Sequence, residues 1–141
     1  MEKYFDTSCA IIGACIGYFF GGFDGLMHTL FVLIAIDYVT GVFAAGMKHE
    51  LSSNVGFKGI KRKVTILLLV GMAHVIDREM LGNTVFLRDG VISFYLANEG
   101  LSILENAIAI GIPAPQKLKE LLLQFHDKND KNDKGEVIIE K

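Results

Sequence analysis

The chain has 141 residues, enough for one domain, and its hydrophobic fraction of 51% and mean hydropathy of +0.40 are high for a water-soluble protein of this size. A net charge of −2 argues against nucleic-acid binding, which usually requires a basic patch on a basic domain. Cys9 and Cys15 have neither metal-ligand nor disulfide-framework spacing, so we expect small apolar side chains there, with no metal and no cofactor.

The first hydrophobic run, residues 7–23, contains no charge and reaches the lower limit of a membrane span. Small residues recur along it at every fourth position, as Cys9, Gly13, Gly17, Gly21 and Gly25. Such a ridge lets helices approach closely in a bilayer, which predicts helix packing through Gly13, Gly17 and Gly21. Residues 21–25 also form a tight turn, which predicts an antiparallel hairpin with the next run.

The second run, residues 26–46, is interrupted by Asp37. An aspartate at mid-helix costs about +3 kcal/mol on insertion, whereas each Leu, Ile, Val or Phe contributes roughly −0.3 to −0.6 kcal/mol. The run has ten such residues, worth about −3 to −6 kcal/mol, so it is predicted to insert. Neither run has a polar face wide enough for a helix exposed to water, which disfavours a buried hairpin in a soluble protein.

A polar loop is expected over residues 48–63, with basic side chains crowded at its end: Lys58, Lys61, Arg62 and Lys63. The third run, residues 64–76, would be about 20 Å long as a helix, against ~30 Å of hydrocarbon. A span over about 61–81 therefore requires the flanking charges to snorkel, and a re-entrant segment is the alternative.

The fourth run, residues 90–112, carries a polar stripe. At about 100° per residue its members fall within an arc of roughly 120°. Ionisable groups are costly in lipid, so the stripe is predicted to face protein or water. Its members are Asn98, Glu99, Ser102, Glu105 and Asn106.

Counting depth along the expected spans gives a polar layer. At 1.5 Å per residue, Asp37, His74 and Glu105 lie about 12–16 Å from the cytoplasmic edge, while Glu99 lies higher and alone. Left unpaired, each group would cost several kcal/mol, so the three are predicted to converge. The alternative is that each faces a separate contact.

Pro113 and Pro115 end the fourth run. Residues 116–126 have the apolar spacing of an amphipathic helix on a membrane surface, and residues 127–141 form a charged tail expected to be disordered. Residues 1–115 are thus predicted to form an all-α, four-span transmembrane domain. Twelve basic residues fall on one side and two on the other, which places both termini in the cytoplasm.

Four segments, in order and with similar gaps, resemble the phage lysis and toxin-secretion holin family: DYVTGVFAAG (37–46), LSSNVGFKGIKRK (51–63), AHVID (73–77) and FYLANEGLSILENAIAIGIPAP (94–115). The similarity covers roughly residues 26–125. It implies a small phage-encoded protein that oligomerises in the bacterial cytoplasmic membrane and opens holes. An endolysin, or a toxin without a signal peptide, then crosses the membrane. The polar residues, Asp37 and His74 included, would line the pore.

Other interpretations stay open on the residues alone. The stripe can instead be satisfied within one chain, by Asp37, Thr40 and His74. Intramembrane acidic groups also mark ion or proton channels and small transporters, and a holin antagonist or membrane adaptor is a third class. An enzyme is not expected, because the histidines are scattered and no nucleophile lies beside a plausible base. The expected partners are lipids, further copies of the chain, and an endolysin or toxin.

Overall fold

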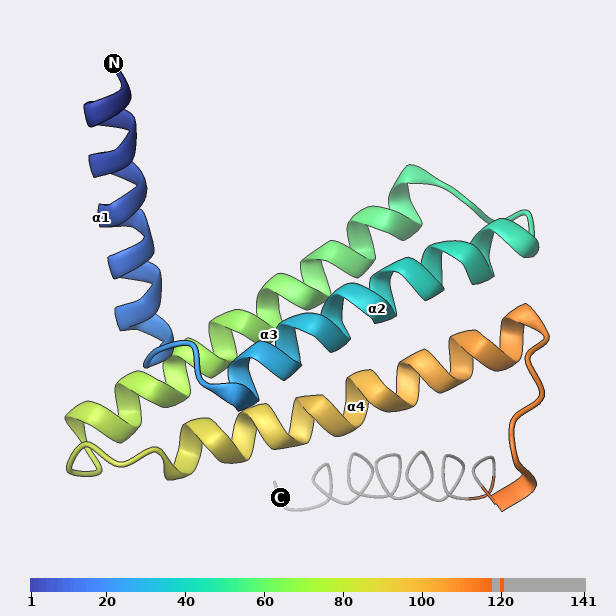
Figure 1. Ribbon diagram of the computed structural model, residues 1–141. Helices are drawn as coiled ribbons and strands as arrows, with labels where there is room; N and C mark the ends of the chain where they lie inside the picture. Colours follow the sequence, from blue (N-terminus) through green and yellow to red (C-terminus); the bar gives the residue numbers. More distant parts are fainter. Residues whose placement is uncertain (118–119, 121–141) are drawn as a thin grey trace, which may run out of the picture.

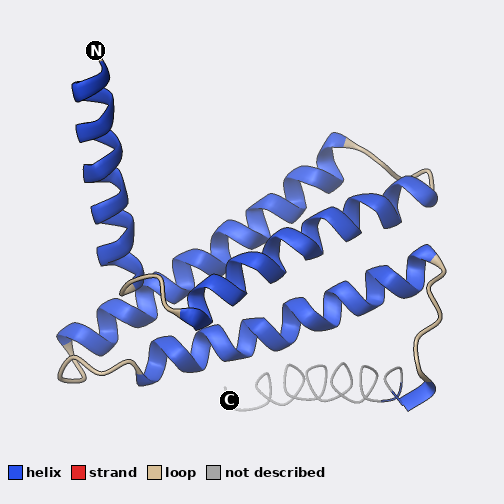
Figure 2. Ribbon diagram, viewed as in Figure 1, coloured by secondary structure: helices blue, strands red, loops and turns tan. Residues whose placement is uncertain are grey.

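A computed structural model describes residues 1–117 and residue 120, and within them the chain is all-α, as predicted (Figure 1). Four helices follow one another: α1 (Glu2–Phe20), α2 (Gly25–Met47), α3 (Ser53–Glu79) and α4 (Phe86–Ile110). No strand occurs in this part of the chain (Figure 2). The predicted tail lies outside the described residues, and so does most of the predicted amphipathic helix at 116–126.

Helices α2, α3 and α4 form a bundle in which α4 packs against both others (Figure 1). Local capping explains where two of the helices start. The Asp24 carboxylate accepts a hydrogen bond from the Met27 amide at 3.0 Å, and the Ser52 hydroxyl accepts one from the Val55 amide at 3.3 Å. At the C-terminal end of α4, Gly111 adopts a φ of 97°, a left-handed conformation that terminates a helix.

Helix α3 is longer than the sequence predicted. It begins at Ser53, so the connection from α2 is short and the expected polar loop over 48–63 is mostly helix. Lys58, Lys61 and Arg62 lie exposed on its early turns, whereas Lys63 is buried. The 27 residues of α3 extend about 41 Å, so the helix is long enough to span the hydrocarbon, while its charge-free apolar stretch is still residues 64–76.

Helix α1 does not form the predicted antiparallel hairpin with α2, but projects away from the bundle (Figure 1). Gly21 ends α1 at a φ of 74°, with the Gly22 amide bonded to the Gly17 carbonyl at 2.8 Å. Phe19 then rests on Gly71 of α3, where a Cβ atom would lie only 1.9 Å from the ring. This contact holds the end of α1 on α3 rather than along α2.

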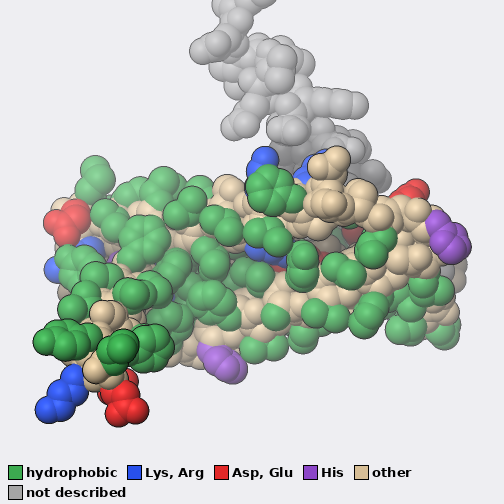
Figure 3. Space-filling view, turned by 90° about the horizontal axis from the view of Figure 1, so that it is seen from above, with side chains coloured by type: hydrophobic (Ala, Val, Ile, Leu, Met, Phe, Trp, Pro, Cys, Tyr) green, Lys and Arg blue, Asp and Glu red, His purple; other side chains and the backbone are tan. Residues whose placement is uncertain are grey.

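The distribution of apolar and charged side chains departs from that of a water-soluble protein, because many large apolar side chains are exposed and several charged ones are buried. Twenty-seven large hydrophobic side chains of the described residues are exposed, and they cover much of the face seen in Figure 3. Only α2, among the helices of the described region, is long and apolar enough to cross a membrane by length and composition. The buried apolar set is small, and it is accompanied by five buried charged residues: Asp37, Lys63, Asp77, Arg88 and Glu99.

Candidate functional site

A buried triad of charges connects the three bundle helices near the middle of their lengths. The Lys63 ammonium of α3 bonds to the carboxylates of Asp37 in α2 and Glu99 in α4. The residues Asp37, Lys63 and Glu99 are 6%, 8% and 0% exposed. Each helix therefore contributes one charge to a site that is closed to solvent on most sides.

Asn106 completes the coordination of Asp37. Its amide nitrogen donates to Asp37 Oδ1 at 3.0 Å, to the Asp37 carbonyl oxygen at 3.3 Å and to Thr40 Oγ1 at 3.1 Å. Both oxygens of the Asp37 carboxylate are thus engaged. Glu99 differs, because its Oε1 is buried and has no hydrogen-bond partner among the described residues.

A pocket of about 660 Å³ leads to this triad from one end of the bundle. It runs from the exposed connection between α2 and α3, at Leu51 and Ser52, to the buried side chains of Asp37 and Lys63. Ser102 also lines it. The polar layer is therefore reachable from the end of the bundle that carries Lys48.

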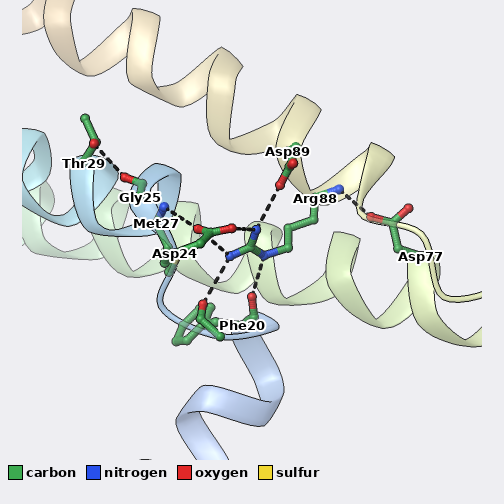
Figure 4. Close-up of polar contacts among 9 residues, drawn as sticks. Phe20, Asp24, Gly25, Met27, Thr29, Asp77, Arg88 and Asp89 are labelled. Atoms are coloured by element: carbon green, nitrogen blue, oxygen red, sulfur yellow. Dashed lines mark hydrogen bonds and ion pairs between the residues drawn. The ribbon is translucent and has the colours of Figure 1, made fainter.

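Figure 4 shows a second polar cluster, centred on Arg88. It lies at the opposite end of the bundle, where α1 connects to α2 and α3 to α4 (Figure 1). The guanidinium donates to the carbonyls of Phe20 at 2.6 Å and Gly22 at 3.2 Å, and to the carboxylates of Asp24 at 2.8 and 3.2 Å and Asp89 at 2.9 Å. The hydrogen bond from Arg88 lowers the pKa of Asp24. One side chain of α4 thereby holds the connection between α1 and α2.

Asp77 of α3 caps the start of α4 in the same region. Its carboxylate accepts hydrogen bonds from the amides of Leu87 at 3.0 Å and Arg88 at 2.7 Å, and from the Thr84 hydroxyl at 3.0 Å. A carboxylate at a helix N-terminus accepts hydrogen bonds from the free backbone amides and interacts favourably with the positive end of the helix dipole. The turn between α3 and α4 is therefore fixed by a residue that precedes it.

Comparison of the sequence with known proteins shows the family of the chain. The sequence model of the bacteriophage holin family matches residues 14–127. The chain belongs to the bacteriophage holin family. The chain is 48% identical over 126 residues to the uncharacterized protein Lin0175 of Listeria innocua, covering 86% of the chain and 89% of that protein. It is 39% identical over 126 residues to an uncharacterized 14.9 kDa protein of Clostridium perfringens, covering 89% and 96%. It is 32% identical over 119 residues to the uncharacterized protein YtkC of Bacillus subtilis, covering 84% and 88%. No solved structure matches the chain.

The polar layer has different members from those predicted. Asp37 is in it, but Glu105 is exposed. His74 lies against Gly21 at the other end of the bundle, where a Cβ at Gly21 would be 2.5 Å from His74 Nδ1. The predicted convergence of Asp37, His74 and Glu105 is therefore wrong. Glu99, expected to be alone, is instead a partner of the same ammonium as Asp37.

The other predicted residues divide into two groups. Asn98 and Ser102 are half-buried, like Asn106, so this part of the stripe faces the bundle. Gly13 and Gly17 face open space, since a Cβ added to either meets nothing within 4 Å. Their predicted packing role therefore requires a partner outside the described residues of one chain. A pore-lining role for any of these side chains stays a prediction.

Proposed function

We propose that this holin inserts in the bacterial cytoplasmic membrane as a four-span protein, oligomerises and opens holes. An endolysin, or a toxin without a signal peptide, leaves the cytoplasm through them, and the host cell lyses. The observation that carries the proposal is the combination of 27 exposed large apolar side chains with five charged residues buried in the bundle. Lipid is a favourable surrounding for such a surface, whereas water is not.

Helix lengths and charge placement support a multi-pass arrangement with both termini in the cytoplasm. At 1.5 Å per residue, the 19 residues of α1 extend about 29 Å and the 25 of α4 about 38 Å, close to or above ~30 Å of hydrocarbon. The end of the bundle at which α2 meets α3 carries exposed Lys48, Lys58 and Lys61. Lys63 is buried in the triad and adds nothing to this surface charge. The exposed lysines still leave an excess of basic residues at this end of the bundle, which favours its location in the cytoplasm.

Several copies are needed for a hole that passes a folded enzyme. In one chain the space between α2, α3 and α4 is filled by apolar side chains and by the triad. Helix α1 leaves the bundle and exposes its small-residue face at Gly13 and Gly17. Close helix approach in membranes uses such faces, which supports assembly through α1.

Inducible expression in a bacterium, with and without a cytoplasmic endolysin, tests the proposal. We expect abrupt growth arrest and loss of membrane potential in both strains, with lysis only where the endolysin is present. Gly17→Leu should delay this event and shorten the ladder of crosslinked oligomers, whereas Cys15→Leu, placed off the ridge, should not. Unimpaired growth with the protein in the membrane would contradict the function.

Cysteine labelling of intact cells tests the topology, in a background in which Cys9 and Cys15 are replaced by serine. Met80→Cys, at the exposed turn after α3, should react with a membrane-impermeant reagent. Lys48→Cys, at the opposite end of the bundle, should react only after the membrane is opened. Labelling of both from the same side would refute the four-span arrangement.

A small ion or proton channel is the second candidate, and the triad at the end of the pocket is the observation that favours it. A channel of this kind would collapse the membrane potential without endolysin-dependent lysis.

A further inference from the structure

The triad carries an unbalanced charge. With every group in its usual ionisation state, Asp37 and Glu99 contribute two negative charges and Lys63 one positive charge, leaving a net charge of −1. The side chains are 8%, 0% and 11% exposed, in the order Asp37, Glu99 and Lys63, so water screens this charge poorly. An uncompensated buried charge costs several kcal/mol, and proteins usually avoid it by a change of protonation.

The hydrogen bonds show where the imbalance lies. Asp37 Oδ2 bonds to Lys63, and Asp37 Oδ1 accepts from Asn106, so this carboxylate is fully satisfied. Glu99 Oε2 bonds to Lys63, but Oε1 is buried without a partner among the described residues. We propose that the triad is a proton-binding site, in which the carboxyl pair of Asp37 and Glu99 holds one proton, carried chiefly on Glu99 Oε1. This inference stands apart from the proposed function.

Among the described residues, no other charged side chain forms an ion pair with the triad to supply the missing positive charge. Asp37 is the charged group that α2 presents to it, Lys63 the one from α3, and Glu99 the one from α4. Arg62 and Glu105, the nearest charged neighbours along α3 and α4, are both exposed. Tyr38 lines the wall of the neighbouring pocket.

A proton fits the site better than a metal cation does. Hard cations such as Ca²⁺ and Mg²⁺ take about six or more oxygen ligands, whereas Glu99 Oε1 is the single buried side-chain oxygen of the described residues left without a partner. The pocket from Leu51 to Lys63 gives protons a route to the triad from the end of the bundle carrying Lys48.

The proton also affects how the helices associate. With it bound, the triad is neutral and joins α2, α3 and α4. Without it, two carboxylates on α2 and α4 share one ammonium, and the excess negative charge lies between helices that pack against each other. The bundle should therefore become less stable as the pH rises and the proton is lost.

Infrared spectroscopy of the full chain in detergent micelles at neutral pH tests the inference. We expect the carbonyl stretching band of a protonated carboxylic acid in the wild type, lost in Glu99→Gln and in Asp37→Asn, since either change leaves one carboxylate paired with Lys63. Glu105→Gln, a matched change at an exposed position of the same helix, should keep the band. Absence of the band in the wild type, or its survival in both triad variants, would overturn the inference.

Thermal unfolding provides an independent readout. Raising the pH above neutrality should lower the unfolding midpoint of the wild type and of Glu105→Gln by more than that of Glu99→Gln or Asp37→Asn. Exchange of sodium for choline salts separates a proton from a metal ion: the proton site predicts equal midpoints in both. A midpoint that rises with sodium, or equal pH dependence in all four proteins, would show that the triad does not bind a proton in this way.

Discussion

Replacement of Arg88 by methionine tests what holds α1 at the end of the bundle. The side chain is 1% exposed, and its guanidinium donates hydrogen bonds to the carbonyls of Phe20 and Gly22 and to the carboxylates of Asp24 and Asp89. Methionine fills a similar unbranched volume and leaves no buried charge behind. The change therefore removes the bonds with little disturbance of packing.

The expected loss of stability follows from the exposure of each partner. Each bond from a charged donor to a carbonyl contributes about 1.5–3 kcal/mol, which gives about 3–6 kcal/mol for the two carbonyls. The Asp24 side chain is 50% exposed, so solvent screens that pair and it adds less than about 1 kcal/mol. The bond to the Gly22 carbonyl is only partly buried and is longer, at 3.2 Å, which favours the lower end of the range. We expect a loss of about 3 kcal/mol.

Thermal unfolding in detergent micelles, together with a spin-label distance between α1 and α4, measures the effect. Arg78→Met is the matched control, because Arg78 is half-exposed, pairs with Glu79 at 3.4 Å and lies 4.3 Å from the Tyr18 ring. Its loss should stay below about 1 kcal/mol. Equal losses for the two variants, or an unchanged distance in Arg88→Met, would refute the argument.

Three further predictions concern the same end of the bundle. The hydrogen bond from Arg88 lowers the pKa of Asp24 below its usual 3.8, so this stabilisation is complete above that value and is lost as the pH falls through the lowered pKa. The free energy of unfolding, measured as the pH is lowered, should therefore fall through this pKa in the wild type, whereas Arg88→Met should lack that fall. Asp77→Ala should cost about 1–2 kcal/mol, because α4 loses its cap, and an unchanged unfolding midpoint would contradict that role. Gly71→Ala should detach α1, since its Cβ would lie 1.9 Å from a ring of that helix, whereas Gly17→Ala meets nothing within 4 Å and should leave the spin-label distance unchanged.

The helices could be predicted from the sequence because hydrophobic periodicity and the terminating residues are local signals. The runs at 7–23, 26–46 and 90–112 overlap α1, α2 and α4. The start of α3 was missed because its early turns are rich in Lys and Gly, a composition read as a loop. The Ser52 cap, with its bond to the Val55 amide, was the signal that could have found it.

The members of the site could not be predicted from depth alone. Counting residues fixes how far a side chain lies along a helix, but not the direction in which it points. Asp37 and Lys63 meet because α3 begins early and turns Lys63 inward, while Glu105 points out of the bundle. The charge pattern also hides the role of Lys63, because its neighbours Lys61 and Arg62 make it resemble a member of an exposed basic cluster. Arg88 is one of the two basic residues predicted to lie outside the cytoplasm. Nothing in the sequence around it marks it as a buried hydrogen-bond donor to the turn before α2.

Release from liposomes tests the central claim most directly. Purified full-length protein would be reconstituted into vesicles that contain both a small dye and a fluorescently labelled folded protein of endolysin size. The account predicts that both are released above a threshold density of protein, and that Gly17→Leu raises this threshold. Loss of the dye alone, at every density, would contradict hole formation and would leave a small ion or proton channel as the function.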